Sequence, residues 1–155
     1  MYVVEHYARF ATDFRDQPIP AQVLHHAKRA VIDWTAAVVP GAVVAPATLL
    51  EKARAEDLDR GGARLMLGRA ATARTAALIN GSAAHTVEVD DIFKFGIFHP
   101  GAPTIAAALA AAQDLGASGE QFLRAVIVGY EISTRIGAAK VAQVASACAK
   151  RVASS

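Results

Sequence analysis

The sequence predicts an all-α fold, an alanine-rich domain of about five to six helices. Apolar residues recur at three- and four-residue steps in nearly every segment, and proline or glycine stands at several segment ends. No run alternates between apolar and polar residues for long enough to predict a sheet. The 155 residues are 54% hydrophobic and 19% charged, which is sufficient for one domain with a buried core.

The first long helix is predicted for residues 21–39. Pro20 stands near its start, where proline is tolerated, and the Pro-Gly-Ala run at 40–42 ends it. One apolar stripe runs along this helix and consists of Leu24, Ala27, Val31, Trp34 and Val38. This face is predicted to pack against the core.

The middle of the chain is predicted to form two more helices. Residues 47–62 read as a shorter, charged helix closed by two glycines, and residues 63–69 as a short, strand-like connector. Residues 71–91 then read as a helix rich in small side chains. Such a helix lets a neighbouring backbone approach closely, so we expect it to be internal.

Two further helices are predicted for residues 103–116 and 118–137. Ser118 and Gln121 have the spacing of a capping box at the start of the second helix. The low-complexity tail, residues 138–155, is expected to continue that helix and then fray. The predicted buried face of the second helix consists of Phe122, Ala125, Val126, Gly129, Ile132 and Ile136.

Composition argues against several classes of protein. The net charge of +2 is too small to predict nucleic-acid binding, and no apolar run reaches the roughly 18 residues of a membrane span. The first residues carry charges and no apolar signal core, which predicts a cytoplasmic protein. Cys148 is the single cysteine, so neither an internal disulfide nor an iron–sulfur cluster is expected.

The titratable groups gather in residues 80–104. If the helix runs to residue 91, His85, Glu88 and Asp91 lie on one side of it, and Asp90 points roughly 100° away from Asp91. Acids on an internal helix are costly unless they are paired or used in chemistry. The segment is therefore a candidate functional site.

His99 begins the second half of this segment. Pro100 biases His99 toward extended geometry, and Gly101 permits a sharp turn into the next helix. The free N–H groups at that helix start favour an anion such as a carboxylate, and Lys94 adds positive charge. A nearby apolar wall is formed by Phe93, Phe95 and Phe98. These are the ingredients for proton abstraction next to a carboxylate.

Structural readings compete with each of these assignments. The paired aspartates are equally consistent with a helix end that binds arginines, and His85 is more often a satisfied core histidine. The phenylalanines also fit a core or dimer contact. A metal site built from His85, Glu88, Asp91 and His99 matches no closed zinc pattern, so no metal is expected.

The segment from Asn80 to the His99-Pro100 pair, together with "VGYEISTRIG", resembles the N-terminal helical part of the MmgE/PrpD family. This family includes 2-methylcitrate dehydratase, cis-aconitate decarboxylase and an iminodisuccinate epimerase. The resemblance covers residues 1–137, and residues 138–155 are a divergent Ala/Ser/Lys-rich tail. It implies cofactor-independent lyase or isomerase chemistry on a small polycarboxylate, and it implies homodimers.

The resemblance also implies roles for individual residues. His99 matches the active-site histidine of the family's His-Pro motif, and Asp90 and Asp91 match its paired aspartates. Glu88 occupies a position where members such as the decarboxylase have an active-site aspartate. These four form the expected catalytic set. The expected substrate-binding set consists of His85, Lys94, Gly101 and Thr104.

Family members are much longer than this chain, and further active-site residues come from their later regions. We therefore expect a truncated member with little or no turnover on its own, without a cofactor. The rival interpretation is a non-catalytic helical module for dimerisation or interaction, which closely packed alanine-rich helices also favour.

Overall fold

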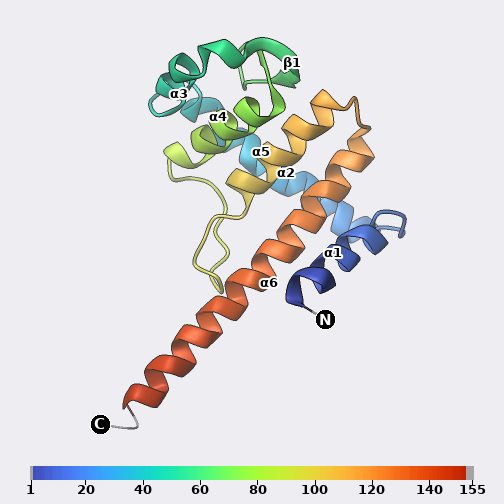
Figure 1. Cartoon of the computed structure of the whole chain (residues 1–155), viewed down its shortest axis with the longest axis vertical. Coiled ribbons are helices and arrows are strands. Elements are labelled where there is room, and N and C mark those ends of the chain that lie inside the picture. Colours follow the sequence, from blue (N-terminus) through green and yellow to red (C-terminus); the bar gives the residue numbers. More distant parts are fainter. Residues whose placement is uncertain (1, 153–155) are drawn as a thin grey trace.

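The structure is a computed structural model that describes residues 2–152, with side chains described through residue 143. Cys148 lies outside the described side chains. Nine elements follow one another in the described residues (Figure 1): α1 (Val3–Phe14), α2 (Ala21–Gly41), α3 (Ala47–Ala53), a short 3-10 helix η1 (Ala55–Asp57), β1 (Leu58–Arg64), β2 (Ala70–Ala71), α4 (Ala73–Thr86), α5 (Gly101–Asp114) and α6 (Gly119–Val152). The predicted mostly helical domain is confirmed, with six α-helices in the described chain.

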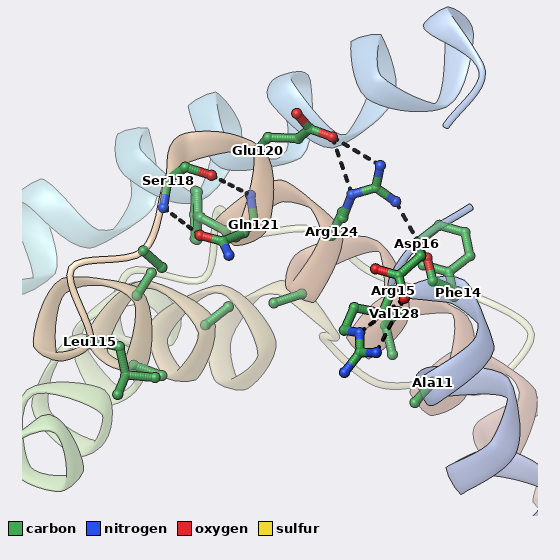
Figure 2. Close-up of a pocket in the computed structure, with 16 residues that line it drawn as sticks. Ala11, Phe14, Arg15, Asp16, Leu115, Ser118, Glu120, Gln121, Arg124 and Val128 are labelled. Atoms are coloured by element: carbon green, nitrogen blue, oxygen red, sulfur yellow. Dashed lines mark hydrogen bonds and ion pairs between the residues drawn. The ribbon is translucent and has the colours of Figure 1, made fainter. Parts of the chain in front are cut away.

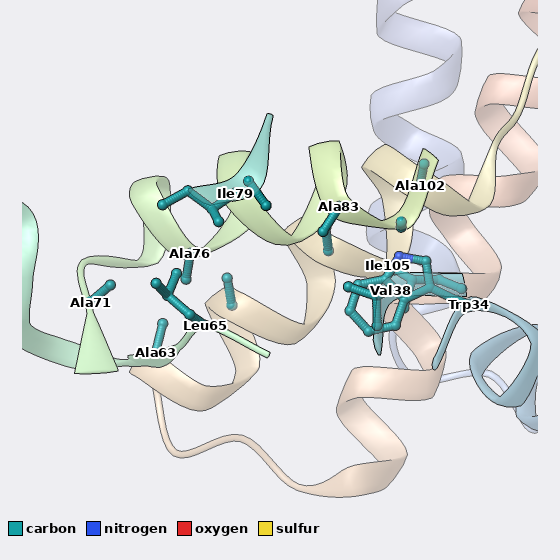
Figure 3. Packing of buried hydrophobic residues seen from close by; sticks show 14 of the residues in the cluster. Trp34, Val38, Ala63, Leu65, Ala71, Ala76, Ile79, Ala83, Ala102 and Ile105 are labelled. Atoms are coloured by element: carbon teal, nitrogen blue, oxygen red, sulfur yellow. The ribbon is translucent and has the colours of Figure 1, made fainter. Parts of the chain in front are cut away.

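Helices α2, α4 and α5 form the core (Figure 3). Trp34 and Val38 of α2 are buried together with Ile79 of α4 and Ile105 of α5. The predicted apolar stripe of α2 thus faces the core. Bulky side chains fill the centre, and small residues elsewhere let the helix backbones come close.

Glycine sets the closest approach between two of these helices. A Cβ atom on Gly41 of α2 would lie 1.9 Å from the carbonyl oxygen of Ala83 on α4. Any side chain at position 41 therefore requires the two helices to separate. The alanine- and glycine-rich composition is explained by this packing, because apolar contact is made between backbones and methyl groups.

The predicted charged helix over 47–62 is wrong beyond Ala53. Residues 58–71 instead form an irregular antiparallel hairpin, in which Ala63 and Leu58 both lie opposite Ala71 across a bulge. Distant side chains hold it: Asn80 of α4 accepts from Met66 N–H at 2.8 Å and donates to Arg64 O at 2.9 Å. The expectation that no sheet forms is corrected accordingly.

The predicted helix over 71–91 is also shorter in the structure. It begins after Thr72, whose hydroxyl caps Thr75 N–H, and ends at Thr86. Glu88 has a left-handed backbone with φ 55°, which no α-helix accommodates. The two aspartates therefore lie in a loop, and helical spacing does not set their directions.

Helix α6 begins at the predicted capping box. Gln121 N–H donates to Ser118 Oγ at 3.2 Å, and Ser118 N–H donates to Gln121 Oε1 at 2.8 Å. As predicted, the helix continues into the tail, and it projects beyond the rest of the molecule (Figure 1). The predicted buried face is confirmed in part: Val126 is fully buried and Phe122, Gly129 and Ile132 are half-buried, whereas Ala125 and Ile136 are exposed. Among the described helices, none combines the length and apolar character that crossing a membrane requires.

Candidate functional site

Two histidines meet on one carboxylate at the end of α4 and the start of α5. His85 Nδ1 lies 3.1 Å from Asp90 Oδ2, and His99 Nδ1 lies 3.3 Å from the same oxygen. The imidazole rings of His85 and His99 are tilted by 55° to one another, with centroids 4.6 Å apart. The loop between α4 and α5 thus brings together three side chains that the sequence analysis selected.

Burial makes Asp90 the centre of this group. Its side chain is 1% exposed, whereas those of His85 and His99 are 47% and 28% exposed. His99 Nδ1 is buried within ion-pair distance of the carboxylate but does not meet hydrogen-bond geometry.

Asp90, and not Asp91 as helical spacing predicted, is the aspartate beside His85. Helical spacing placed Asp91 on the side of His85 and Asp90 away from it, whereas in the structure Asp90 contacts His85. The cause is the early end of α4, because the loop reverses the directions of the two acids. Glu88 remains near, with its carboxylate oxygen 3.8 Å from His85 Nε2, and is largely exposed.

Asp91 binds the start of α5 and the middle of α6. Its Oδ1 accepts from Gly101 N–H at 3.0 Å, and its Oδ2 accepts from the Tyr130 hydroxyl at 2.9 Å. The predicted anion at this helix start is therefore the protein's own carboxylate. Tyr130 was not predicted as a site residue, although it lies in the "VGYEISTRIG" segment; a tyrosine among apolar helix positions was the available signal.

Both members of the Asp91–Tyr130 pair have shifted pKa values. Burial raises the pKa of Asp91 above its ordinary 3.8, and the carboxylates of Asp33 and Asp90 act in the same direction, against the two hydrogen bonds that it accepts. Burial, followed by the Asp91 charge, raises the pKa of Tyr130 well above its ordinary 10.0. The phenol therefore stays protonated at neutral pH and donates to Asp91.

A groove of about 860 Å³ opens beside the two histidines. Its titratable lining residues are His85, Glu88 and His99. The remaining lining residues are small or apolar for the most part: Pro46, Ala77, Leu78, Gly81, Ser82, Thr86, Phe98, Ala102 and Pro103. An apolar groove with a few convergent polar groups is the usual form of a small-molecule site.

Three of the four residues expected to bind the substrate lie outside this groove. Lys94 is exposed, with its ammonium 5.1 Å from the centre of the Phe95 ring. The N–H of Gly101 donates a hydrogen bond to Asp91. Thr104 packs against Gly129 of α6, and a Cβ atom on Gly129 would lie 2.4 Å from the Thr104 methyl. The structure therefore does not place these three residues in the lining of the groove.

The expected phenylalanine wall is only partly present. Phe98 lines the groove, and Phe93 packs edge-on against it with ring centroids 6.0 Å apart. Phe95 contacts Phe93 but is 63% exposed. One ring of the three therefore shields the groove directly.

The donor set of the histidine cluster is also compatible with a metal ion in its chemistry. His85, Asp90 and His99 each offer a ligand atom, and these atoms lie within 4.8 Å of one another. Nitrogen and carboxylate donors suit zinc or iron. The hydrogen bond between His85 and Asp90 explains why these two side chains lie close together without an ion.

A second hollow, of about 910 Å³, lies between α1, α5 and α6, away from the histidines (Figure 2). Its floor is formed mainly by alanines, and its charged groups are already paired, Arg15 with Asp16 and Arg124 with Glu120. It contains no histidine. The histidine groove is therefore the better candidate for chemistry.

Comparisons with known proteins identify the family of this chain. The MmgE/PrpD N-terminal domain matches residues 5–147. A protein of Aspergillus oryzae named cis-aconitate decarboxylase-like protein oryM is 32% identical over 139 residues, which cover 84% of this chain and 29% of that protein. The chain thus spans less than a third of the length of this relative. Since the domain match extends over nearly the whole sequence, the chain belongs to the MmgE/PrpD family.

Proposed function

We propose that this chain supplies one wall of a site where a small polycarboxylate undergoes lyase or isomerase chemistry next to a carboxylate. The reaction class comprises dehydration, decarboxylation and epimerisation. The observation that carries the proposal is the pair of histidines sharing the buried Asp90 beside an apolar groove. Membership of the MmgE/PrpD family and the name of the Aspergillus oryzae relative support the substrate class.

His99 is the acid/base group in this proposal. A carboxylate beside Nδ1 favours the tautomer with hydrogen on that nitrogen and leaves Nε2 to accept or donate a proton. Asp90 orients the ring and balances the charge when His99 is protonated. His85 and Glu88 extend this network at the mouth of the groove.

Among the residues that the structure describes, no lysine or arginine lines the groove. The two imidazoles are thus its only groups that can become cationic, whereas a polycarboxylate carries two or three negative charges. Charged groups aimed at a developing charge usually make the largest contribution to catalysis. We therefore expect this chain by itself to bind such acids weakly and to turn them over slowly or not at all.

An NMR titration of the five histidines with citrate and cis-aconitate tests the proposal. Saturable shifts of the His85 and His99 signals, abolished in His99→Ala and retained in His25→Ala, are the expected result. His25 lies on the exposed face of α2, so its variant controls for nonspecific effects of removing an imidazole. Unmoved signals in a well-dispersed spectrum would overturn the proposal.

Direct assays test the expectation on turnover. Methylcitrate, cis-aconitate and iminodisuccinate are incubated with the chain, and products are followed by chromatography. Rates at or near the uncatalysed background are expected. Turnover at ordinary enzyme rates, roughly 1 per second or faster, would show that the cationic groups are dispensable.

A helical interaction module is the second candidate, and exposed apolar side chains favour it. Ile92 and Ile97 of the loop before His99 are 62% and 74% exposed, and Ile136 of α6 is 51% exposed. In this case the chain would form homodimers or bind a partner through these residues. Sedimentation that depends on protein concentration but not on added carboxylates would favour the module over the binding site.

A further inference from the structure

One carboxylate closes the loop that carries His99. Asp91 and Gly101 stand at the two ends of the segment 91–101, which contains His99, and Asp91 accepts a hydrogen bond from Gly101 N–H. Asp90 directly precedes Asp91, and His99 stands two residues before Gly101. The Asp91–Gly101 bond thus ties together the two backbone positions that determine how far Asp90 lies from His99.

Tyr130 of α6 holds this closure from outside the loop. Its hydroxyl donates to the second oxygen of Asp91 at 2.9 Å. A Cβ atom on Gly101 would lie 2.6 Å from that hydroxyl and 2.5 Å from Asp91 Oδ1. The start of α5 is therefore seated directly against the Tyr130–Asp91 pair, and only glycine permits this distance.

Helix α6 touches the loop at a second point. A Cβ atom on Gly137 would lie 2.6 Å from the ring of Phe98, the residue before His99. The loop therefore rests on α6 both through Asp91 and through Phe98. Tyr130 itself does not line the histidine groove, but faces a smaller hollow between α2 and α6.

We propose that Tyr130 is a positioning residue of the histidine site, whose hydroxyl acts through Asp91 to hold His99 beside Asp90. The expected contribution of Tyr130 to ligand binding rests on the proposed function. The expected effect of Tyr130 on the position of His99 does not rest on it, because that effect is present without any ligand. Tyr130 makes no contact with the substrate in this arrangement.

The test compares Tyr130→Phe with Tyr7→Phe, a matched control that removes a hydroxyl from α1. The ring signals of His99, assigned with His99→Gln, are recorded without ligand, and citrate binding is then titrated. In Tyr130→Phe we expect shifted His99 signals and about two- to tenfold weaker citrate binding, the effect of one lost hydrogen bond. Tyr7→Phe should leave both unchanged.

A double-mutant cycle with Asp91→Ala shows whether Tyr130 acts through Asp91. Adding Tyr130→Phe to Asp91→Ala should then cause no further shift of the His99 signals. If Asp91→Ala does not fold, the His99 ring signals of the Tyr130→Phe variant still test the inference. Unchanged His99 signals in a folded Tyr130→Phe protein would overturn the inference, even where its melting temperature falls.

The outcomes also separate this inference from the proposed function. If citrate binds neither wild type nor variant but the His99 signals shift in Tyr130→Phe, the positioning role stands and the polycarboxylate site fails. If citrate binds both proteins equally and His99 is unmoved, the site stands and the role of Tyr130 fails.

Discussion

At the scale of single residues, Asp91 couples stability to pH. Its pKa is raised in the folded protein, so the stability it contributes is present below its ordinary value of 3.8 and is lost as the pH rises through the folded value. Asparagine does not ionise, so the Asp91→Asn variant does not lose this stability as the pH rises. We expect the unfolding free energy of Asp91→Asn to improve relative to wild type as the pH rises from 3 to 7.

Urea denaturation at a series of pH values measures this difference. Asp57 and Asp59, whose pKa values are lowered by hydrogen bonds from Thr75 and Arg69, change stability in the opposite direction. They are common to both proteins and cancel in the comparison. A difference that does not vary with pH would contradict the assignment of a raised pKa to Asp91.

Gly101 offers a sharper test of the same contact. In Gly101→Ala the new methyl group would overlap Asp91 and the Tyr130 hydroxyl, so the start of α5 must move. We expect a loss of roughly 1–3 kcal/mol in unfolding free energy, the usual cost of overpacking. Thermal denaturation measures it, with Gly116→Asn as control, since Gly116 has open space and a positive φ that asparagine tolerates.

The sequence predicted that titratable side chains gather in one segment, but not how they are oriented. Three of these side chains, His85, Asp90 and His99, meet in the structure. The directions of Asp90 and Asp91 were predicted from an unbroken helix, which Glu88 ends with a left-handed backbone. Glutamate is not a residue from which such a stop is expected, since glycine or asparagine is usual.

At the scale of elements, the contact between α2 and α4 depends on Gly41. A methyl group there would overlap the Ala83 carbonyl, which belongs to a helix backbone and cannot turn aside. We expect Gly41→Ala to cost about 3 kcal/mol or more, at the upper end of overpacking costs. Gly119→Ala is the control, because Gly119 also lies in a helix but has nothing within 4 Å.

Chemical denaturation of the two variants separates packing from helix propensity. Alanine favours a helix over glycine by up to about 1 kcal/mol, so Gly119→Ala should be neutral or stabilising. Equal effects of the two substitutions would mean that α2 and α4 are not in close contact.

Elements built from local signals were predicted best. Helix α2 and the capping box of α6 depend on residues close in sequence, and both are confirmed. The hairpin over 58–71 depends on Asn80, Gln113 and Asp114, which hydrogen-bond to its backbone from α4 and α5. The sequence of the hairpin itself does not reveal these partners. Its first residues were therefore predicted to be the end of a charged helix.

At the scale of the whole molecule, Arg124 joins α1 to the rest of the fold (Figure 2). Its guanidinium donates to the carbonyl oxygens of Phe14 and Gln17, at 3.3 and 2.6 Å, and pairs with Glu120. Helix α1 has no fully buried residue of its own. Arg124→Ala should therefore release α1 while the core remains folded.

Hydrogen exchange measures this release. In Arg124→Ala we expect faster amide exchange across residues 3–14 and unchanged protection in α4 and α5. Arg135→Ala is the control, because among the described side chains Arg135 pairs only with Glu131, on its own helix. Protection of α1 that survives in Arg124→Ala would show that apolar contact alone holds it.

The three contacts along α6 have a consequence for how this chain can diverge. Thr104 meets Gly129, Asp91 meets Tyr130, and Phe98 meets Gly137, so one helix surface is matched to two other segments at fixed intervals. Inserting or deleting one residue between positions 130 and 137 would rotate one contact away from the others by roughly 100°. Substitutions can accumulate on the outward face of this stretch, whereas a gap in an alignment here would mark a relative whose histidine loop is supported in another way.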